Sequence, residues 1–576
     1  MTDLNKHTFV CGITGSGKTT TVKKILVEAK KPFMVIESAK KEYRNIPIDT
    51  TIYTLGKPEV NCPQINPFYI MPGVSPQSHI DYLKDLFIAS FSFYGPMPYI
   101  LEKCLHNIYR NKGWNLTLGY HPLIVNTLGS VDFFDIAYMR KQYYKNAHRY
   151  LFPTMQELKD EIERYVKEEM DYEGEVAGNI KTAIKVRLEN LCVGAKGYMF
   201  NTYEHLDLAE LLESNIVFEL EGLADDSDKA FCVGLMVIFI NEYRQTIKET
   251  HGNKKNELLH LLVIEEAHRL LKNVDTERSS ESMSNPKGKA VEHFTNMIAE
   301  MRSYGQGVIV AEQIPSKLAP DVIKNSSNKI IQRIISADDQ KIIANTIGIS
   351  ADDAIQLGTL ETGYALCHKE GMALPVSVKI DSVEDNFVSD ELLYNLDSER
   401  MSKIDLSIAR EAVYKDKESK QIAIGLLNTI LVEEDELAIK ATEIAVNRFT
   451  GILKCNGITP IVGSNTTANI AIIVCDILMN FIVRGIYAAA KLPDNDFCTF
   501  LVEFISSPTQ KSAQVITRKF TELYGQNTSK YSKRIIYELI KRKATVNTDI
   551  KASIKEYFIE VSEQTINEIL KTTREV

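Results

Sequence analysis

The stretch Gly12-Ile13-Thr14-Gly15-Ser16-Gly17-Lys18-Thr19 sets the fold class that we predict for this sequence. It satisfies the pattern G-x-x-x-x-G-K-[ST]. It stands between the apolar run 7–11, which predicts a short buried strand, and residues 20–29, which predict a helix. In that setting the glycines let backbone N–H groups curl around phosphates, and the helix N-terminus adds the positive end of its dipole. We therefore expect a phosphate-binding loop at the start of an α/β domain.

Each residue type in this loop has an expected task. The ammonium group of Lys18 is expected to reach the β- and γ-phosphates, and the hydroxyl of Thr19 is expected to ligate Mg²⁺. The predicted ligands are thus ATP and Mg²⁺. The residues expected to contact the nucleotide span the loop and the first helical turn: Gly12, Thr14, Gly15, Ser16, Gly17, Lys18, Thr19 and Thr20.

Two adjacent acids follow the apolar strand-like run 258–264. A buried strand can deliver a carboxylate to the Mg²⁺ shell, so Glu265 is expected to support the metal directly or through water. Glu266 is expected to polarise the attacking water as general base. The alternative is a solvated helix N-terminus, where acids are favoured for a different reason. His268 is expected to pack or cap.

Polar residues near the next strand-like run, 307–311, complete the candidate catalytic set. Gln313 can orient the lytic water and sense the γ-phosphate, with a loop hydrogen bond as the alternative. Arg302 is predicted at a helix end just upstream, where its planar fork could reach the γ-phosphate of a neighbouring subunit. Arg333, on the following strand, is the rival candidate. An ordinary surface ion pair is the alternative for both arginines.

The remaining pattern predicts an α/β core interrupted by helices. The core is expected to cover 1–67 and 213–385, with a helical insertion over 68–212 and a helical C-terminal domain over 386–576. The polar stretch 273–289 is predicted to be a loop. Further strands are expected at 33–36, 215–220, 329–334, 363–368 and 375–380.

Charge limits the ways in which this chain can contact DNA. The 576 residues carry a net charge of −9, so any DNA contact requires a local basic stripe or a pore lining. Two regions are candidates: 140–150, where basic and aromatic residues alternate, and 518–543, which has eight basic against two acidic residues. Solvated helix faces are the alternative for both.

The sequence predicts a cytoplasmic protein with no membrane insertion. Its nine cysteines lack zinc-binding spacing, which is typical of reduced thiols, and residues 1–7 lack the apolar core of a signal peptide. The most apolar window, 469–490, is interrupted by Asp476 and Arg484. We expect that window to form a buried helix.

Several of these motifs occur together in one family. The sequence resembles the HerA-type ATPases, relatives of the FtsK DNA pumps and of conjugative secretion ATPases. The resemblance covers about residues 7–380, with Glu265 at a position where many members have Asp. The stretches that carry it are 9–19, 35–44, 65–68, 264–268, 300–305 and 313–318.

This resemblance implies a RecA-like P-loop ATPase core and a ring hexamer with ATP sites shared between subunits. It also implies movement along double-stranded DNA with a nuclease or another effector partner, in DNA end processing or anti-phage defence. HerA proteins carry a β-barrel before the core. Gly12 lies near the first residue, which leaves no room for a barrel here, and three alternatives stay open: the barrel is absent, replaced, or missing from this version of the chain. Two other functions stay open: a conjugation or secretion ATPase, and an ATP-gated oligomeric scaffold for an effector enzyme.

Overall fold

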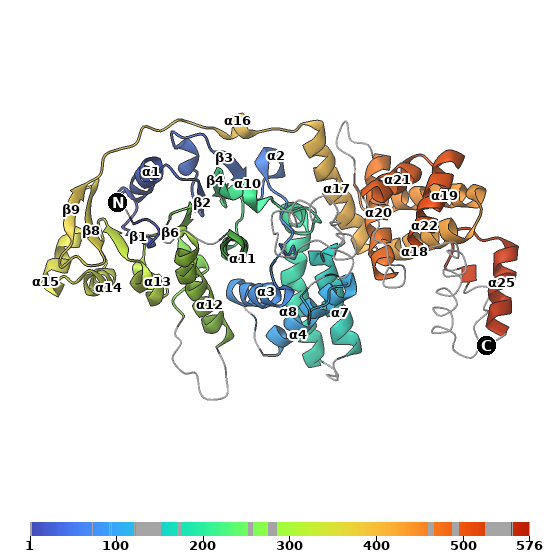
Figure 1. Cartoon of the computed structure of the whole chain (residues 1–576), viewed down its shortest axis with the longest axis horizontal. Coiled ribbons are helices and arrows are strands. Elements are labelled where there is room, and N and C mark those ends of the chain that lie inside the picture. The colour runs from blue at the N-terminus through green and yellow to red at the C-terminus, as the bar shows by residue number, and fades with distance from the viewer. Residues whose placement is uncertain are drawn as a thin grey trace.

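The fold is described from a computed structural model (Figure 1). The ranges that the structure describes are 3–71, 73–91, 93, 95–119, 121, 151–169, 175–251, 257–274, 285–416, 418–458, 466–485, 495–524, 554–555 and 557–574. The basic region 140–150 and most of the basic region 518–543 lie outside these ranges, so their predicted roles stay predictions.

A nine-stranded sheet organises the first two-thirds of the chain, in the order β3-β4-β2-β5-β6-β1-β7-β8-β9. The seven strands from β3 to β7 in this order are parallel, and β8 and β9 complete the sheet as antiparallel strands. The predicted α/β class is confirmed. The strands are β1 (Thr8–Cys11), β2 (Phe33–Glu37), β3 (Thr51–Thr54), β4 (Asn215–Glu219), β5 (His260–Glu265), β6 (Gln306–Glu312), β7 (Asn328–Ile331), β8 (Tyr364–Lys369) and β9 (Val376–Lys379).

The central strands are almost wholly buried because both faces of the sheet are covered, and their polar residues are confined to positions near the strand ends. Their side chains alternate between two cores. In β1, Phe9 joins the larger core and Val10 joins the smaller core on the opposite face. In β5, Leu262 and Val263 divide in the same way. This explains why the sequence shows continuous apolar runs here instead of an apolar–polar alternation.

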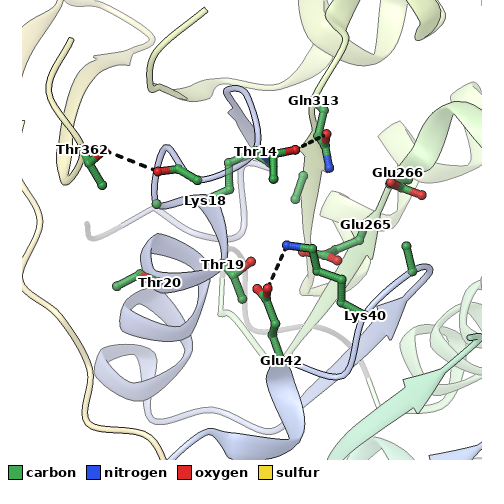
Figure 2. A pocket seen from close by; sticks show the side chains of 14 residues that line it. Thr14, Lys18, Thr19, Thr20, Lys40, Glu42, Glu265, Glu266, Gln313 and Thr362 are labelled. Carbon is green, nitrogen blue, oxygen red and sulfur yellow. Dashed lines mark hydrogen bonds and ion pairs between the residues drawn. The ribbon is translucent and has the colours of Figure 1, made fainter.

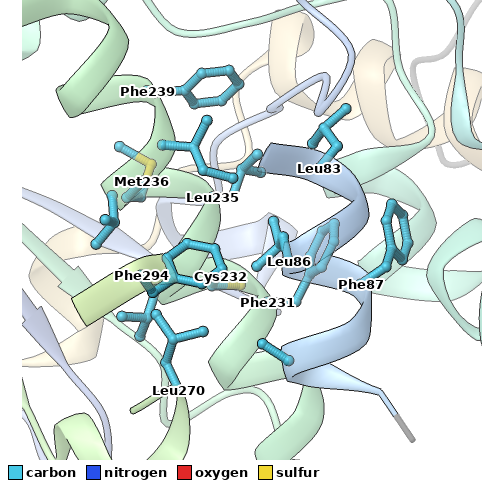
Figure 3. Close-up of a cluster of buried hydrophobic side chains, with 14 of the residues drawn as sticks. Leu83, Leu86, Phe87, Phe231, Cys232, Leu235, Met236, Phe239, Leu270 and Phe294 are labelled. Atoms are coloured by element: carbon cyan, nitrogen blue, oxygen red, sulfur yellow. The ribbon is translucent and has the colours of Figure 1, made fainter. Parts of the chain in front are cut away.

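The two faces of the sheet are covered by different helices. Helix α1 (Lys18–Ala29) packs into the smaller core through residues such as Val22 and Leu26. The larger core is built by α3 (Pro76–Ser90), α11 (Asp226–His251) and α12 (Pro286–Met301), whose aromatic and aliphatic side chains interlock in Figure 3. The phosphate-binding loop therefore connects β1, which is covered on both faces of the sheet, to α1, which packs on the face with the smaller core.

Helices dominate the chain between β3 and β4. They share the larger core with α11 and α12, so this segment packs as an extension of the α/β core. The predicted domain boundaries stay a prediction. The helices of this segment with described bounds are α2 (Pro58–Asn61), α3, α4 (Met97–Lys112), α7 (Met155–Glu168), α8 (Glu175–Cys192), α9 (Gly194–Phe200) and α10 (Leu208–Leu212).

An extended strap leads from β9 to the C-terminal helices, along the top of the view in Figure 1. Residues 381–397 form this strap, and its carboxylate Asp390 makes ion pairs with Lys41, Arg44 and Lys57. Two further hydrogen bonds join the strap to Asn45. The strap is thus tied to the α/β core beyond the boundary predicted at residue 385.

The described residues after the strap form helices. A separate core, containing residues such as Leu426, Phe449 and Leu478, holds most of them together. Their bounds are α16 (Asp390–Leu393, within the strap), α17 (Ser398–Lys415), α18 (Ser419–Val432), α19 (Asp435–Cys455), α20 (Thr466–Gly485), α21 (Asn495–Ser506), α22 (Gln510–Tyr524) and α25 (Glu563–Arg574).

Helix α20 contains most of the apolar window that we expected to be buried. Asp476, in its middle, is fully buried and pairs with Arg410 of α17. Throughout the described ranges, none of the helices is both long and apolar enough to span a membrane.

Two sequence predictions need correction. Strand β3 was not predicted, because its four residues, Thr51–Thr54, form an edge strand that is only partly buried and carry little apolar signal. Most of the loop predicted over 273–289, residues 275–284, lies outside the described residues, and the predicted end at 289 is wrong because α12 begins at Pro286 with Asn285 as its N-cap. Proline is favoured in the first helical turn, where its missing N–H has no intrahelical partner to lose.

Candidate nucleotide-binding site

The loop between β1 and α1 has glycines at positions where a side chain is disfavoured. Gly17, the N-cap of α1, has φ 108°, a value that residues with a Cβ rarely adopt. A Cβ on Gly12 would lie 2.6 Å from the hydroxyl oxygen of Ser16 and 2.8 Å from the Cβ of Gln332, so no side chain fits there. The Ile13 N–H donates to the carbonyl oxygen of Arg333 at 2.9 Å and ties the loop to the end of β7.

Lys18 folds back over this loop. Its ammonium donates to the carbonyl oxygens of Gly12 at 2.7 Å and Ile13 at 3.2 Å. Burial lowers the pKa of Lys18, and the charge of Glu265 opposes that change. The lysine thus lies at the loop centre with its charge satisfied by weak acceptors, which a phosphate group can replace.

A cavity of about 270 Å³ opens beside the loop and brings most of the predicted residues together (Figure 2). Glu265 and Glu266 reach it from the end of β5, and Gln313 reaches it from the end of β6. These strand ends share one edge of the sheet, where parallel α/β sheets bind ligands. The loop residues on its wall are Thr14, Gly15, Gly17, Lys18, Thr19 and Thr20.

Gly12 and Ser16 do not line this cavity. Ser16 is buried, and its hydroxyl donates to the carbonyl oxygen of Ile13 at 2.7 Å. Ser16 thus holds the loop together through its hydroxyl, and the predicted nucleotide contact of Gly12 and Ser16 stays a prediction.

Glu265 is a half-buried carboxylate suited to a cation. Its Oε1 accepts a hydrogen bond from the Tyr43 hydroxyl at 2.9 Å. Burial raises the pKa of Glu265 to about 7, since the hydrogen bond from Tyr43 offsets only part of the desolvation and Glu42 adds like charge. A divalent cation would favour its ionised form. Thr19 lines the same cavity, so a hydroxyl and a carboxylate, both ligands that Mg²⁺ accepts, face one space.

Glu266 has a strained backbone and a fixed side chain. Its φ of 49° lies in the left-handed region, which is uncommon for a residue with a side chain. The side chain accepts hydrogen bonds from Arg269, which in turn pairs with Asp226 at the start of α11. The left-handed backbone conformation directs this carboxylate to the cavity wall, and the ion pairs hold it there.

Gln313 is joined directly to the phosphate-binding loop. The Thr14 hydroxyl donates to its Oε1 at 3.0 Å (Figure 2). Its backbone N–H donates at 2.7 Å to Glu312, a fully buried acid. Glu312 also lies 2.8 Å from His268 Nδ1, so one carboxylate connects the ends of β5 and β6. His268 thus packs against Glu312, as expected.

The two candidate arginines do not line the cavity. Arg302 is exposed and lies beyond the C-terminal end of α12, at the edge of the sheet where β6 begins. Arg333 contributes its backbone carbonyl to the loop, and its Nε is buried without a hydrogen-bond partner in the described part of the chain. The cavity of this chain is therefore built without either guanidinium.

Several residues at the site were not assigned a role from sequence. Lys40, Glu42 and Thr362 line the cavity, and Tyr43, Glu312 and Arg269 hold the predicted carboxylates and the glutamine. Only Glu312 could have been identified from the sequence, because it is an acid at the end of a fully buried strand. The others could not be found, since their contacts join segments more than forty residues apart or depend on loop conformation.

The chain is similar in sequence to proteins named as helicases. It is 26% identical over 260 residues to the DNA double-strand break repair helicase HerA of Sulfolobus acidocaldarius, covering 41% of this chain and 50% of the relative. It is 31% identical over 126 residues to the HerA of Sulfurisphaera tokodaii, covering 22% and 23% respectively. The chain thus spans half or less of the length of these relatives. No family model matches it.

Solved structures with a similar chain path include the VirB4 of Thermoanaerobacter pseudethanolicus. That structure is 17% identical, with a TM-score of 0.45, and the match covers 66% of this chain and 90% of VirB4. The assignment of the fold rests on the strand order and on the loop geometry described above.

The glycine loop, the parallel sheet around β1 and the two acids at the end of β5 define a P-loop ATPase with a RecA-like core. Within this class, the sequence similarity to the HerA helicases confirms the predicted resemblance to the HerA type.

Proposed function

We propose that this chain is the motor subunit of an ATP-driven ring that moves along double-stranded DNA. One observation carries the proposal: a single cavity gathers Lys18, Thr19, Glu265, Glu266 and Gln313. These side chains supply a phosphate-binding cation, a metal-binding pair, a general base and a polar sensor. The HerA relatives are named as DNA repair helicases, which supports DNA as the track.

The proposed chemistry follows from the positions of these groups. Thr19 and Glu265 would hold Mg²⁺, which supplies neutralising charge at the β- and γ-phosphate oxygens. Lys18 leaves the carbonyl oxygens of Gly12 and Ile13 and pairs with the phosphates. Glu266 accepts a proton from the attacking water, while Gln313 orients that water and is linked through Thr14 to the loop.

The proposal includes assembly into a ring, with a hexamer as the expected size. Arg302 supports it, because this arginine is exposed and lies away from the cavity of its own chain. A neighbouring subunit that presented its cavity to Arg302 would receive the missing guanidinium. We further propose a nuclease or another effector protein as partner and a cytoplasmic location, with anti-phage defence as one setting.

The test is ATP turnover by the full chain with and without linear duplex DNA, on protein sized by mass photometry. We expect Mg²⁺-dependent turnover that DNA stimulates, and a ring that ATP tightens. Lys18→Ala is the control and should nearly abolish turnover, because it removes a positioned cation from the transferring phosphoryl group. Equal ATP turnover with and without DNA would favour an export ATPase or an ATP-gated scaffold. Monomers alone at micromolar concentration with ATP would refute the ring.

A further inference from the structure

A second lysine faces the nucleotide cavity, and the proposed chemistry gives it no task. Lys40 follows β2 by three residues and lines the same cavity as Lys18. Its ammonium donates to Glu42 Oε1 at 2.8 Å. In Figure 2 the side chain extends along the cavity, with its nitrogen between the carboxylates of Glu42 and Glu265.

The electrostatics show that this ammonium belongs to the site. The hydrogen bond to Glu42 raises the pKa of Lys40, and the charges of Glu265 and Glu37 act in the same direction. The pKa of Lys18 is lowered first by burial, and the charge of Lys40 contributes to that decrease. The two ammonium groups therefore repel one another across a space that also holds acids. A ligand with several negative charges would relieve this repulsion.

The ion pair that holds Lys40 is weak enough to be exchanged. The side chains of Lys40 and Glu42 are 47% and 41% exposed. Ion pairs with this exposure contribute little to stability. A terminal phosphate carries more charge than a carboxylate and offers three oxygens. A phosphate within reach would therefore compete well with Glu42 for the ammonium.

The neighbouring lysine shows that this position is specific. Lys41 does not line the cavity and is held by Asp390 at 2.8 Å and Glu221 at 3.1 Å. Its side chain is turned toward the strap, so the same loop places one lysine in the site and one outside it.

We propose that Lys40 is a second phosphate-binding residue, whose ammonium leaves Glu42 and pairs with the terminal phosphate of a bound nucleoside triphosphate. This inference rests on the proposed function, because it requires a nucleotide in the cavity. Glu42, which also accepts a hydrogen bond from Thr19, is then released beside the residues expected to hold Mg²⁺. Triphosphate binding thus replaces the ion pair between Lys40 and Glu42 with two others. Lys40 pairs with the terminal phosphate, and Glu42 is free to pair with Mg²⁺.

The exchange predicts that Lys40 distinguishes the triphosphate from the diphosphate. The experiment measures the affinity of the full chain for the magnesium complexes of AMP-PNP and ADP by calorimetry. Lys40→Ala should weaken the affinity for AMP-PNP about tenfold or more, as expected for the loss of one charge-assisted hydrogen bond. The affinity for ADP should change less than about twofold. Lys40→Arg should keep most of the affinity for AMP-PNP, because it keeps the cation.

Lys41→Ala is the matched control and should bind both nucleotides as the unchanged protein does. Equal AMP-PNP affinity in Lys40→Ala and the unchanged protein would overturn the assignment. An equal loss for AMP-PNP and ADP would also overturn it, since that result indicates a general effect of charge or folding. If the unchanged protein bound neither nucleotide, the proposed function itself would fail, so the two failures are distinguishable.

Discussion

The guanidinium of Arg269 donates two hydrogen bonds to one carboxylate oxygen of Glu266, from Nε at 3.0 Å and from Nη2 at 2.5 Å. This contact fixes the orientation of the candidate general base before any nucleotide arrives. It spans three residues, yet it depends on the left-handed conformation of Glu266 and on Asp226 behind the arginine. Preorganisation of this kind determines where a water molecule can be activated.

Glu266→Gln should separate nucleotide binding from hydrolysis. The amide preserves the shape of the side chain but cannot accept a proton, so turnover should fall by about 10² or more while ATP still binds. Measuring kcat beside the affinity for a non-hydrolysable analogue checks this. If Glu265→Gln gave the binding-competent, inactive protein and Glu266→Gln turned over normally, the roles of the two acids would be exchanged.

Arg269→Ala tests whether the arginine acts through Glu266. We expect kcat to fall about tenfold, with little change in KM, because the carboxylate loses its fixed orientation. In a Glu266→Gln background, Arg269→Ala should lower kcat hardly any further, since the effects of residues that act as a unit are not additive. Arg164→Ala, which removes ion pairs of α7 and does not touch the nucleotide cavity, is the control. Fully additive losses would show that Arg269 acts independently.

Arg302→Ala should keep ATP binding and lose most hydrolysis, by about 10³ if the guanidinium stabilises the transition state of a neighbour. Mixing Arg302→Ala subunits with Lys18→Ala subunits should restore part of the activity, because some interfaces regain both groups. Turnover of the mixture, measured after subunit exchange has been demonstrated, decides the question. Normal activity in Arg302→Ala alone would direct attention to Arg333.

His7 predicts a loss of stability in acid. Its Nε2 donates to the Ile298 carbonyl oxygen at 2.7 Å, and its Nδ1 accepts from the Val308 N–H at 3.1 Å, so the ring must be neutral. Burial lowers the pKa of His7 to about 4 from its ordinary value of 6.5. Between these pH values the unfolded chain binds the proton and the folded chain does not. Lowering the pH through this window should therefore lower the free energy of unfolding, by up to about 3 kcal/mol.

Denaturant unfolding at several pH values measures this effect. His7→Gln can still donate and accept but does not titrate, so its stability should fall less steeply between pH 6.5 and 4. An identical slope in both proteins would contradict the prediction. The same contacts hold the last turns of α12, next to Arg302, so the variant also reports on the placement of that arginine.

Asp476→Asn should destabilise the C-terminal helices. Asp476 and Arg410 are both buried, and removing one partner leaves an uncompensated charge, at a cost of about 3–5 kcal/mol. Thermal unfolding followed by circular dichroism should show a lower transition temperature. Glu399→Gln, which breaks an exposed ion pair with Lys403 on α17, should leave it nearly unchanged. Equal effects of the two changes would refute the role of the buried pair.

The sequence by itself determined the phosphate-binding loop and the fold class. Residues 12–19 encode their task locally, because glycines at fixed positions permit the backbone conformation and Lys18 follows directly. The buried strands were also predictable. Both faces of the sheet are covered, so a side chain must be apolar whichever face it points to, as Phe9 on one face and Val263 on the other show. The acids at the end of β5 followed from the same pattern. Edge strand β3 escaped prediction because it lacks that burial.

Only the tertiary structure decided which side chains meet. Tyr43 reaches Glu265 across 222 positions, and Thr14 reaches Gln313 across 299. The position of Lys40 inside the cavity and of Lys41 outside it depends on the turn of one loop. The physical reason is that hydrogen bonds and ion pairs act over a few ångströms, and the parallel sheet brings the ends of strands from distant segments to one edge. Sequence spacing does not encode those distances.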